Sequence, residues 1–287
     1  MKGRLFYVVQ GGLAGFFFGT SAIFIRFLPS MDSFTIGFYR LALATIFLTV
    51  PSIFLIRRTL LETLKLKGVR ALLLGIIIGG HFAMYISSVK LTTVMNATVL
   101  TNTTPIFASL LSLLFYKVKP SSRVSLGILV SLIGMFVIFL GARSGGASMV
   151  GDLQAVLAAL LWAIYLVFGR NVRIGSNPIA VMIPIYLSSS LLLCTSSFFL
   201  GNLRPPSSTE IPAIFGLAVF PTALGHTLSF SSLKGLQPYQ TAILSFLEPV
   251  VASILAIPLF GETPSSNALL GSLLIFAGIY LVVSVER

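Results

Sequence analysis

The sequence predicts an all-α integral membrane protein whose ten transmembrane helices form two inverted five-helix repeats. The first observation is composition, because the 287 residues are 56% hydrophobic and 9% charged, with a mean hydropathy of +1.02. The second is the recurrence of apolar runs about 20 residues long, the length that a helix needs to cross about 30 Å of hydrocarbon. The third is a similarity between the two halves at one offset of 144 residues, the distance from Pro105 to Pro249.

The predicted spans follow one another through short loops, and Gly or Pro marks several of their ends, as at Lys119-Pro120 and Arg204-Pro205. No extramembrane domain separates them, so any ligand is expected to bind within the helix bundle. The predicted spans are 6–28, 34–56, 70–89, 93–116, 124–142, 153–170, 178–200, 211–232, 237–260 and 267–285.

The basic residues predict the orientation of these spans. Of the 19 Lys and Arg residues, 14 fall at one predicted face, four at the other, and Arg40 lies inside a span. Because Lys and Arg collect in cytoplasmic loops, both termini are expected in the cytoplasm. The 14 are Lys2, Arg4, Arg57, Arg58, Lys65, Lys67, Arg70, Lys117, Lys119, Arg123, Arg170, Arg173, Lys234 and Arg287, and the four are Arg26, Lys90, Arg143 and Arg204.

The net charge of +12 is explained by this bias, so we expect no nucleic-acid partner. The expected partners are a small-molecule substrate and membrane lipid. We expect a monomer, although the sequence leaves an oligomer open. No targeting segment precedes the first span, which favours the plasma (inner) membrane of a bacterium or archaeon.

The internal repeat divides the chain into residues 1–143 and 144–287, each with five spans. At the offset of 144, residues 105–134 contain 11 identities without a gap, and the shared residues include Pro and Gly. Another match places Ser87-Ser88-Val89-Lys90 on Ser231-Ser232-Leu233-Lys234. Because each half holds an odd number of spans, the second half should enter the membrane upside down relative to the first.

Two matching loops differ in charge as this inversion requires. Residues 117–127 read KVKPSSRVSLG and residues 261–271 read GETPSSNALLG. The first loop contains three basic residues and should be cytoplasmic, whereas the second contains Glu262 and should be external. Inverted repeats of this kind are typical of secondary transporters.

Several motifs resemble the drug/metabolite transporter superfamily, in its EamA branch. They are Phe38-Tyr39-Arg40 in the second span, Asn102-Thr103-Thr104-Pro105 in the fourth, and FLEPVVAS followed by Gly261-Glu262 from residue 246 on. The last span contributes LGSLLIFAGIY from residue 270. Tyr116-Lys117-Val118 departs from the Gly-Glu that the family commonly has in that loop. The resemblance covers the whole chain and is looser in the first half.

The resemblance implies a bundle whose fifth and tenth spans pack at the periphery while the other spans surround a central cavity. Family members export amino acids and other small metabolites, and the superfamily also holds carriers of sugar phosphates and nucleotide sugars. The resemblance therefore implies a secondary transporter of small organic solutes, amino acids including aromatic ones or related metabolites. It implies export by alternating access. It does not select the substrate.

Two charged residues lie within predicted spans, Arg40 and Glu248, and both occupy positions of the family pattern. Because ionisable groups are costly in hydrocarbon, they should face a cavity or a partner. They could contact substrate or form a gate that opens as the halves move. A static buried pair, or two separately hydrogen-bonded groups, is the structural alternative. Glu248 could also bind a coupling proton.

Aromatic and polar residues complete the predicted substrate cavity. His81 and His226 occupy the paired third and eighth spans, one position from equivalence. Trp162 is the only tryptophan and lies mid-span, with Tyr165 one turn later and Tyr85 one turn after His81, so these rings could line a pocket. Helix packing is the alternative for each of them. Most of the 24 Phe, Phe18 included, are expected in packing or lipid contact.

Polar residues precede a proline in the fourth and the ninth span. Prolines leave carbonyls free, and helix breaks at matching positions of two halves point to a transport site. Pro105 and Pro249 are the predicted kinks. Polar contacts between helices are the alternative. The polar residues assigned to the cavity from these spans are Asn96, Asn102, Gln240 and Ser245.

Other chemistry has little support in the sequence. We expect no metal site and no cofactor, since the two His are far apart, Cys194 is the single thiol, and no Gly-rich phosphate loop occurs. The protein is not expected to be an enzyme. A proton-coupled drug exporter is the alternative function, and an intramembrane enzyme and a channel are weaker ones.

Overall fold

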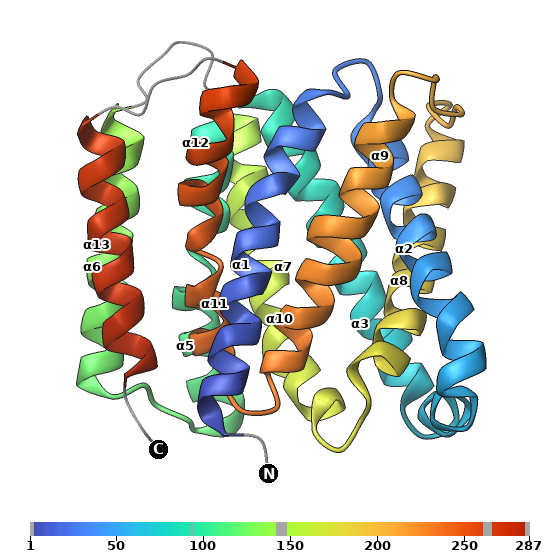
Figure 1. The fold of residues 1–287 in the computed structure, drawn as a ribbon, viewed down its shortest axis with the longest axis horizontal. Helices are drawn as coiled ribbons and strands as arrows, with labels where there is room; N and C mark the ends of the chain where they lie inside the picture. Colours follow the sequence, from blue (N-terminus) through green and yellow to red (C-terminus); the bar gives the residue numbers. More distant parts are fainter. Residues whose placement is uncertain (1–2, 93, 142–147, 261–265, 285–287) are drawn as a thin grey trace.

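The computed structural model describes residues 3–92, 94–141, 148–260 and 266–284, and every element within them is helical (Figure 1). The predictions for Lys2, Arg143, Glu262, Pro264 and Arg287 lie outside the described residues. Apolar side chains cover much of the outer surface, for example Phe54, Leu55 and Phe199, which are 83%, 80% and 84% exposed. Such a surface is stable only in lipid, so this is a multi-pass membrane protein.

The first half contains six helices and the second contains seven helices and one π-helical segment within the described residues. The first six are α1 (Arg4–Arg26), α2 (Ser33–Leu55), α3 (Arg57–Leu91), α4 (Val94–Thr101), α5 (Thr104–Tyr116) and α6 (Ser122–Gly141). The rest are α7 (Met149–Arg173), α8 (Pro178–Phe199), α9 (Ile211–Leu217), η1 (Ala218–His226), α10 (Thr227–Ser232), α11 (Pro238–Leu244), α12 (Leu247–Phe260) and α13 (Ser266–Val283).

The prediction of ten continuous helices is met only in part. Eight apolar helical stretches are long enough to cross a membrane, and the fifth and tenth predicted spans contain shorter apolar stretches, Ser122–Ile138 and Leu269–Val283, within the described residues. The fourth, eighth and ninth predicted spans are each divided into segments. The third starts 13 residues early, because residues 57–69, expected in a loop, form the first turns of α3. Lys67 Nζ in these turns donates to Val172 O at 2.9 Å and anchors them.

The breaks in the fourth and ninth spans fall at nearly equivalent positions, after Thr101 and after Leu244. Pro105 has no N–H to donate to the carbonyl four residues earlier, that of Thr101. The Thr104 hydroxyl donates to that carbonyl instead, at 2.7 Å. In the second half, Pro249 cannot donate to Ser245 O, which accepts from Glu248 N at 2.9 Å. Each proline therefore leaves a short irregular segment before it.

A third proline accompanies the π-helix η1 in the eighth span. Pro221 lies inside η1 and has no N–H to donate to a carbonyl of the preceding turn. The next residue, Thr222, donates its hydroxyl to Leu217 O in that turn at 2.6 Å. π-Helical turns often occur at functional sites because the extra residue redirects side chains.

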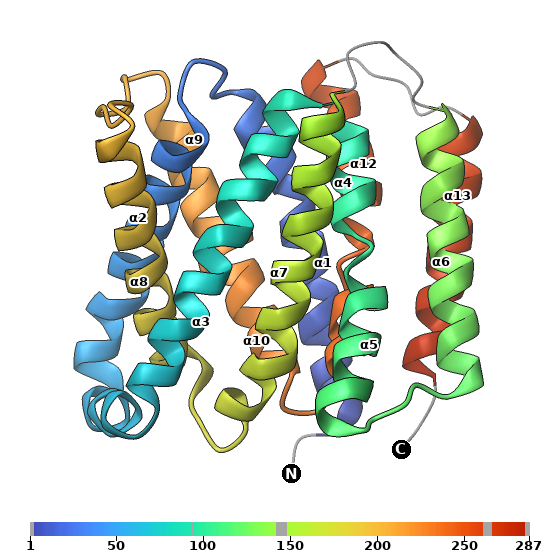
Figure 2. The ribbon, with the colours of Figure 1, turned by 180° about the vertical axis from the view of Figure 1, so that it is seen from behind.

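α6 and α13, which occupy equivalent places in the two halves, run antiparallel to each other. A Cβ on Gly134 would lie 2.6 Å from Gly271 O, and a Cβ on Gly127 would lie 2.7 Å from Gly278 O. Gly271 and Gly278 are themselves the repeat equivalents of Gly127 and Gly134. The two contacts are thus related by an approximate two-fold axis, as in an isologous interface. This pair lies at one edge of the bundle in both views (Figures 1 and 2).

The start of α1 and the end of α13 meet at the same end of the bundle (Figure 1), where Arg4 Nη1 donates to Val283 O. The α2–α3, α5–α6, α7–α8 and α10–α11 connections lie at this end too (Figure 2). We call it the terminal end. The opposite end holds the α1–α2 and α8–α9 connections. Arg204 and Glu210 form a 2.6 Å ion pair within the α8–α9 connection, and Ser30 of the α1–α2 connection donates to Glu210 Oε1 at 3.2 Å.

Candidate functional site

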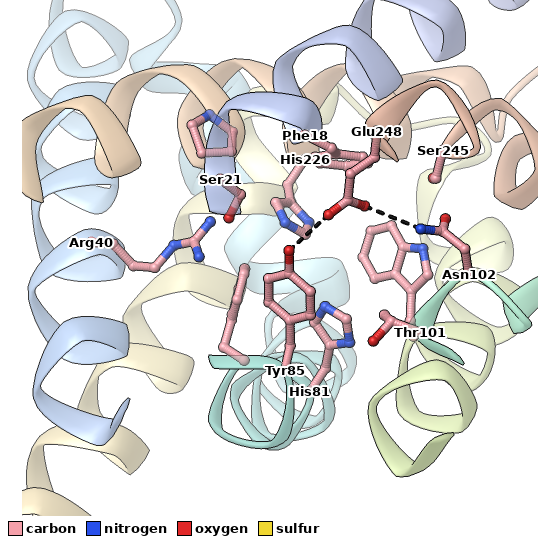
Figure 3. Close-up of a pocket in the computed structure, with 13 residues that line it drawn as sticks. Phe18, Ser21, Arg40, His81, Tyr85, Thr101, Asn102, His226, Ser245 and Glu248 are labelled. Carbon is pink, nitrogen blue, oxygen red and sulfur yellow. Dashed lines mark hydrogen bonds between the residues drawn. The ribbon is translucent and has the colours of Figure 1, made fainter. Parts of the chain in front are cut away.

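A cavity lies in the middle of the bundle, between α1, α2, α3, α7, η1 and the two helix breaks (Figure 3). The empty volume of the cavity, open solvent at its mouth included, is about 420 Å³. The volume that the centre of a water molecule can occupy is much smaller, about 40 Å³. One water molecule needs about 10–15 Å³ of this smaller volume. The cavity therefore holds a few waters as it stands and must widen to admit an organic solute.

Eight sequence-predicted residues line this cavity. They are Arg40, His81, Tyr85, Asn102, Trp162, His226, Ser245 and Glu248.

Glu248 places a carboxylate in the cavity from the first turn of α12. Its side chain is 7% exposed. Tyr85 donates to Oε1 at 2.7 Å and Asn102 Nδ2 to Oε2 at 3.5 Å (Figure 3). Both neighbours come from the first half of the chain, and Asn102 lies in the helix break. The two donors hold the carboxylate in place without neutralising it, so a cationic group could still bind there.

Arg40 lies on the other side of the cavity and is 1% exposed. Its Nε donates to the Thr222 hydroxyl at 2.9 Å, which positions it against the π-helix. The guanidinium carbon lies 4.4 Å from the ring centre of Phe82, a cation–π contact. Nη1 is buried without a hydrogen-bond partner. Among the described residues, Arg40 forms no salt bridge with Glu248, so the static pair is not present in this conformation.

Aromatic rings line the same cavity as the two charges. Trp162 packs edge-on to His226 with centroids 4.9 Å apart, and lies 5.3 Å from His81 and 6.0 Å from Phe18. The ring of His226 also lies 4.8 Å from Phe82. This wall could contact a planar or apolar side chain.

The two histidines differ in their partners. His81 Nδ1 is 2.9 Å from Ala158 O, so His81 both lines the cavity and holds α3 against α7. His226 Nδ1 is buried and has no partner. A buried polar atom without a partner is uncommon and indicates that a ligand or water completes the bond.

Three residues predicted for the cavity lie elsewhere. Asn96, in the first turn of α4, donates through Nδ2 to Asp152 Oδ1 at 3.1 Å near the start of α7. Tyr165 stacks behind Trp162 and donates to Met182 Sδ at 3.3 Å. Gln240 turns back to accept from Gln237 N at 3.0 Å, in the capping box of α11.

The predicted kinks Pro105 and Pro249 flank the helix breaks without lining the cavity. Phe18 and Phe82 also line the cavity, although Phe18 was expected in packing or lipid contact. Neither could be separated from the other phenylalanines by sequence alone. Pro221 also lines the cavity. Its position as a proline in the middle of a predicted span is the sequence feature that could have identified it. Within the described residues, no group of three His, Cys, Asp or Glu side chains comes together to hold a metal.

Comparisons with known proteins agree with this architecture. A family model described as the EamA-like transporter family matches residues 5–140 and, a second time, residues 149–284. An uncharacterized transporter of Archaeoglobus fulgidus is 23% identical over 93% of each chain. A Salmonella typhimurium protein described as a probable amino-acid metabolite efflux pump is 33% identical over 55% of this chain and 56% of that one. One crystal structure with 20% sequence identity superimposes with a TM-score of 0.82 over 96% of this chain and 95% of that one, and shows the same fold.

Proposed function

The chain belongs to the EamA-like transporter family, and on this premise we propose that it exports amino acids or related zwitterionic metabolites across the plasma membrane. Aromatic amino acids are included among the candidates. Transport proceeds by alternating access around the central cavity. The observation that carries the proposal is that two buried, opposite charges, Glu248 and Arg40, line one cavity together with aromatic rings.

A zwitterion complements both charges at once. An α-ammonium group at Glu248 would gain a charge-assisted hydrogen bond, and an α-carboxylate could accept from the unpartnered Nη1 of Arg40. The solute's side chain would lie against Trp162 and Phe18. An unpaired buried charge is costly, so a ligand that pairs with both Glu248 and Arg40 is favoured over a ligand that pairs with neither residue.

The proposed alternating access rests on the helix breaks and the inverted halves. Asn102 and Ser245 occupy the two breaks, and both line the cavity. A break lets the two parts of a span tilt separately. Because the cavity is now too small for an organic solute, the conformation described here fits an almost closed step between the two open ones. Residues 1–143 and 144–287 are the two proposed moving units.

The name of the Salmonella relative supports both an amino-acid substrate and outward transport. The proposed orientation places the terminal end, with both termini, in the cytoplasm, because Lys and Arg collect there. A proton-coupled drug exporter is the second candidate, favoured by Glu248 alone: a cation without a carboxylate would use that residue and the rings and leave Arg40 unused.

A counterflow experiment tests the proposal. Proteoliposomes loaded with one unlabelled amino acid at a time are given trace amounts of the same labelled compound outside. We expect transient, saturable accumulation for at least one amino acid, and none for its N-acetyl derivative or its methyl ester. A flux that rises linearly with the gradient without saturating would indicate a channel. Accumulation of the methyl ester as strong as that of the amino acid would favour the drug-exporter alternative and contradict the zwitterion proposal.

A further inference from the structure

A second cavity lies at the terminal end of the bundle and shares no residue with the central one. Its walls come from the start of α1, the start of α6, the last turns of α7 and the α10–α11 connection. About 170 Å³ of it is open to the centres of water molecules, which is enough for several waters or one polyatomic ion. The polar residues in its walls are Arg4, Ser121, Arg170, Gln237, Tyr239 and Gln240.

Two guanidinium groups in this cavity have buried nitrogens without partners. Arg4 donates through Nη1 to Val283 O, but its Nη2 is buried and has no hydrogen-bond partner. The Nε of Arg170 is buried and unpartnered in the same way. A basic residue whose only role is to orient the protein in the membrane could keep its guanidinium group fully in water. Arg4 and Arg170 instead place N–H donors inside a cavity, and each unpaired donor destabilises the protein until an acceptor binds.

Among the residues that the structure describes, no acidic side chain lines this cavity. The five acidic residues within the described part of the chain are engaged elsewhere, in a helix cap, ion pairs or hydrogen bonds. They are Asp32, Glu62, Asp152, Glu210 and Glu248. The acceptor that the two arginines lack therefore has to come from another molecule, or from the chain end beyond residue 284.

The first turn of α6 strengthens the positive potential. Ser121, which precedes this 20-residue helix, and Val124 in its first turn both line the cavity, so the positive end of the helix dipole lies next to it. The N–H of Val124 itself donates to Ser121 Oγ at 3.4 Å. The side chains of Gln237 and Gln240 add amide groups. Two guanidinium groups, a helix start and amides form a set of donors that suits an oxyanion with several acceptor oxygens.

We propose that this terminal cavity binds a phosphate-type oxyanion, either the headgroup of an anionic phospholipid or a soluble phosphate compound. Both sources present the same tetrahedral group. The terminal end is the proposed cytoplasmic face, where anionic lipid headgroups and soluble phosphates both occur. The site is independent of which solute occupies the central cavity.

Occupancy of this site would affect transport, because its walls belong to both halves. Arg4 and Ser121 come from the first half, and Arg170 and Gln240 from the second. An anion that accepts from both arginines joins α1 and α6 to α7 and α11. It therefore stabilises the conformation in which these helices meet at the terminal end, and disfavours opening at that end.

The test measures anion binding by the purified full-length chain. Inorganic phosphate is titrated by calorimetry at constant ionic strength, with chloride as the reference anion. In parallel, the protein is reconstituted in nanodiscs of mixed phosphatidylglycerol and phosphatidylcholine, and the lipids it retains are identified by native mass spectrometry. The variants are Arg4→Gln and Arg170→Gln. Arg58→Gln is the matched control, since Arg58 is 93% exposed at the same end and pairs with Glu62.

We expect the wild-type protein to bind phosphate, to retain phosphatidylglycerol, or both. Each cavity variant should weaken that binding at least about tenfold, the effect of losing one charge-assisted hydrogen bond, while Arg58→Gln changes it less than about twofold. Binding of phosphate alone identifies a soluble ligand, and retention of the lipid alone identifies a headgroup. The proposal is overturned if the wild-type protein binds neither. It is equally overturned if the control loses as much affinity as the cavity variants.

Discussion

Replacing Glu248 with glutamine removes the negative charge of the central cavity and leaves its shape nearly intact. The glutamine oxygen can still accept from Tyr85, which now donates to Glu248 at 2.7 Å. Asn102 keeps its bond to Thr98 O at 2.9 Å. A neutral amide is also cheaper to bury than a carboxylate. The variant should therefore fold and insert with a Tm no lower than that of the wild-type protein.

Substrate binding, in contrast, should weaken strongly. If the α-ammonium group of the solute donates to Glu248, the substitution changes a hydrogen bond to a charged acceptor into one to a neutral acceptor. A hydrogen bond to a charged group contributes about 1.5–3 kcal/mol. Since about 1.4 kcal/mol corresponds to a tenfold change in affinity, we expect the Kd to rise about 10- to 150-fold.

The only tryptophan of the chain supplies the assay, because Trp162 lines the cavity. Its fluorescence is titrated with the amino acid that gives the strongest counterflow and with the N-acetyl derivative of that amino acid. The derivative lacks the ammonium group, so its weak binding should not respond to Glu248→Gln. Glu62→Gln is the control, since Glu62 is a carboxylate 58% exposed on the surface.

Two results would refute this account of the cavity. One is a Kd for the amino acid within about twofold of the wild-type value in Glu248→Gln. The other is an equal loss of affinity for the amino acid and its N-acetyl derivative, which would mean that Glu248 shapes the cavity without binding the amine.

Three other predictions concern packing, the cavity wall and pH. Gly134→Ala should lower the Tm in a thermal unfolding assay, because the new Cβ would lie 2.6 Å from a backbone oxygen of α13 and overpacking costs about 1–3 kcal/mol. The control is Gly68→Ala, whose new Cβ would have no atom within 4 Å, so its Tm should be unchanged or higher. Equal Tm shifts in the two variants would contradict the α6–α13 contact. Trp162→Ala should reduce counterflow while the protein still inserts, and an unchanged rate would remove Trp162 from the proposed site. At the end opposite the terminal end, Arg204 and the Ser207 N–H hold the pKa of Glu210 well below its usual range. The stabilisation from Glu210 is complete above the unfolded-state pKa near 4.3 and is lost as pH falls below it toward the folded-state pKa. The Tm should therefore fall on acidification below about pH 4, and less so in Glu210→Gln; identical pH profiles for the two proteins would rule out this contribution.

Much of the fold could be predicted from the sequence because hydrophobic length is a local property. Each apolar run forms a helix independently of the other runs, because in lipid the backbone must satisfy its hydrogen bonds within the same segment. The offset of 144 predicted inverted halves because each half holds an odd number of spans. The antiparallel contact of α6 and α13 at Gly127, Gly134, Gly271 and Gly278 agrees with that prediction. The irregular segments were anticipated where a proline marks them, before Pro105 and Pro249.

The site was only partly predictable, because a side chain's direction depends on how its helix is rotated and where it bends. Composition and depth singled out Arg40 and Glu248, but nothing local indicated that Thr222 and Phe82 hold Arg40 apart from Glu248. The same limit applies to Asn96, whose polarity matched a cavity residue although it faces Asp152.

The sequence by itself determined that this chain spans the membrane many times and that its halves are related by duplication, since both follow from the order of apolar and polar residues along the chain. The tertiary structure decided which polar groups share the central cavity, where the π-helix turns Thr222 toward Arg40, and how Arg4 and Arg170 come to line one cavity at the terminal end. Those arrangements join residues as far apart in the sequence as Ser21 and Glu248, both of which line the central cavity. They depend on helix rotation and packing, for which no short stretch of sequence carries the information.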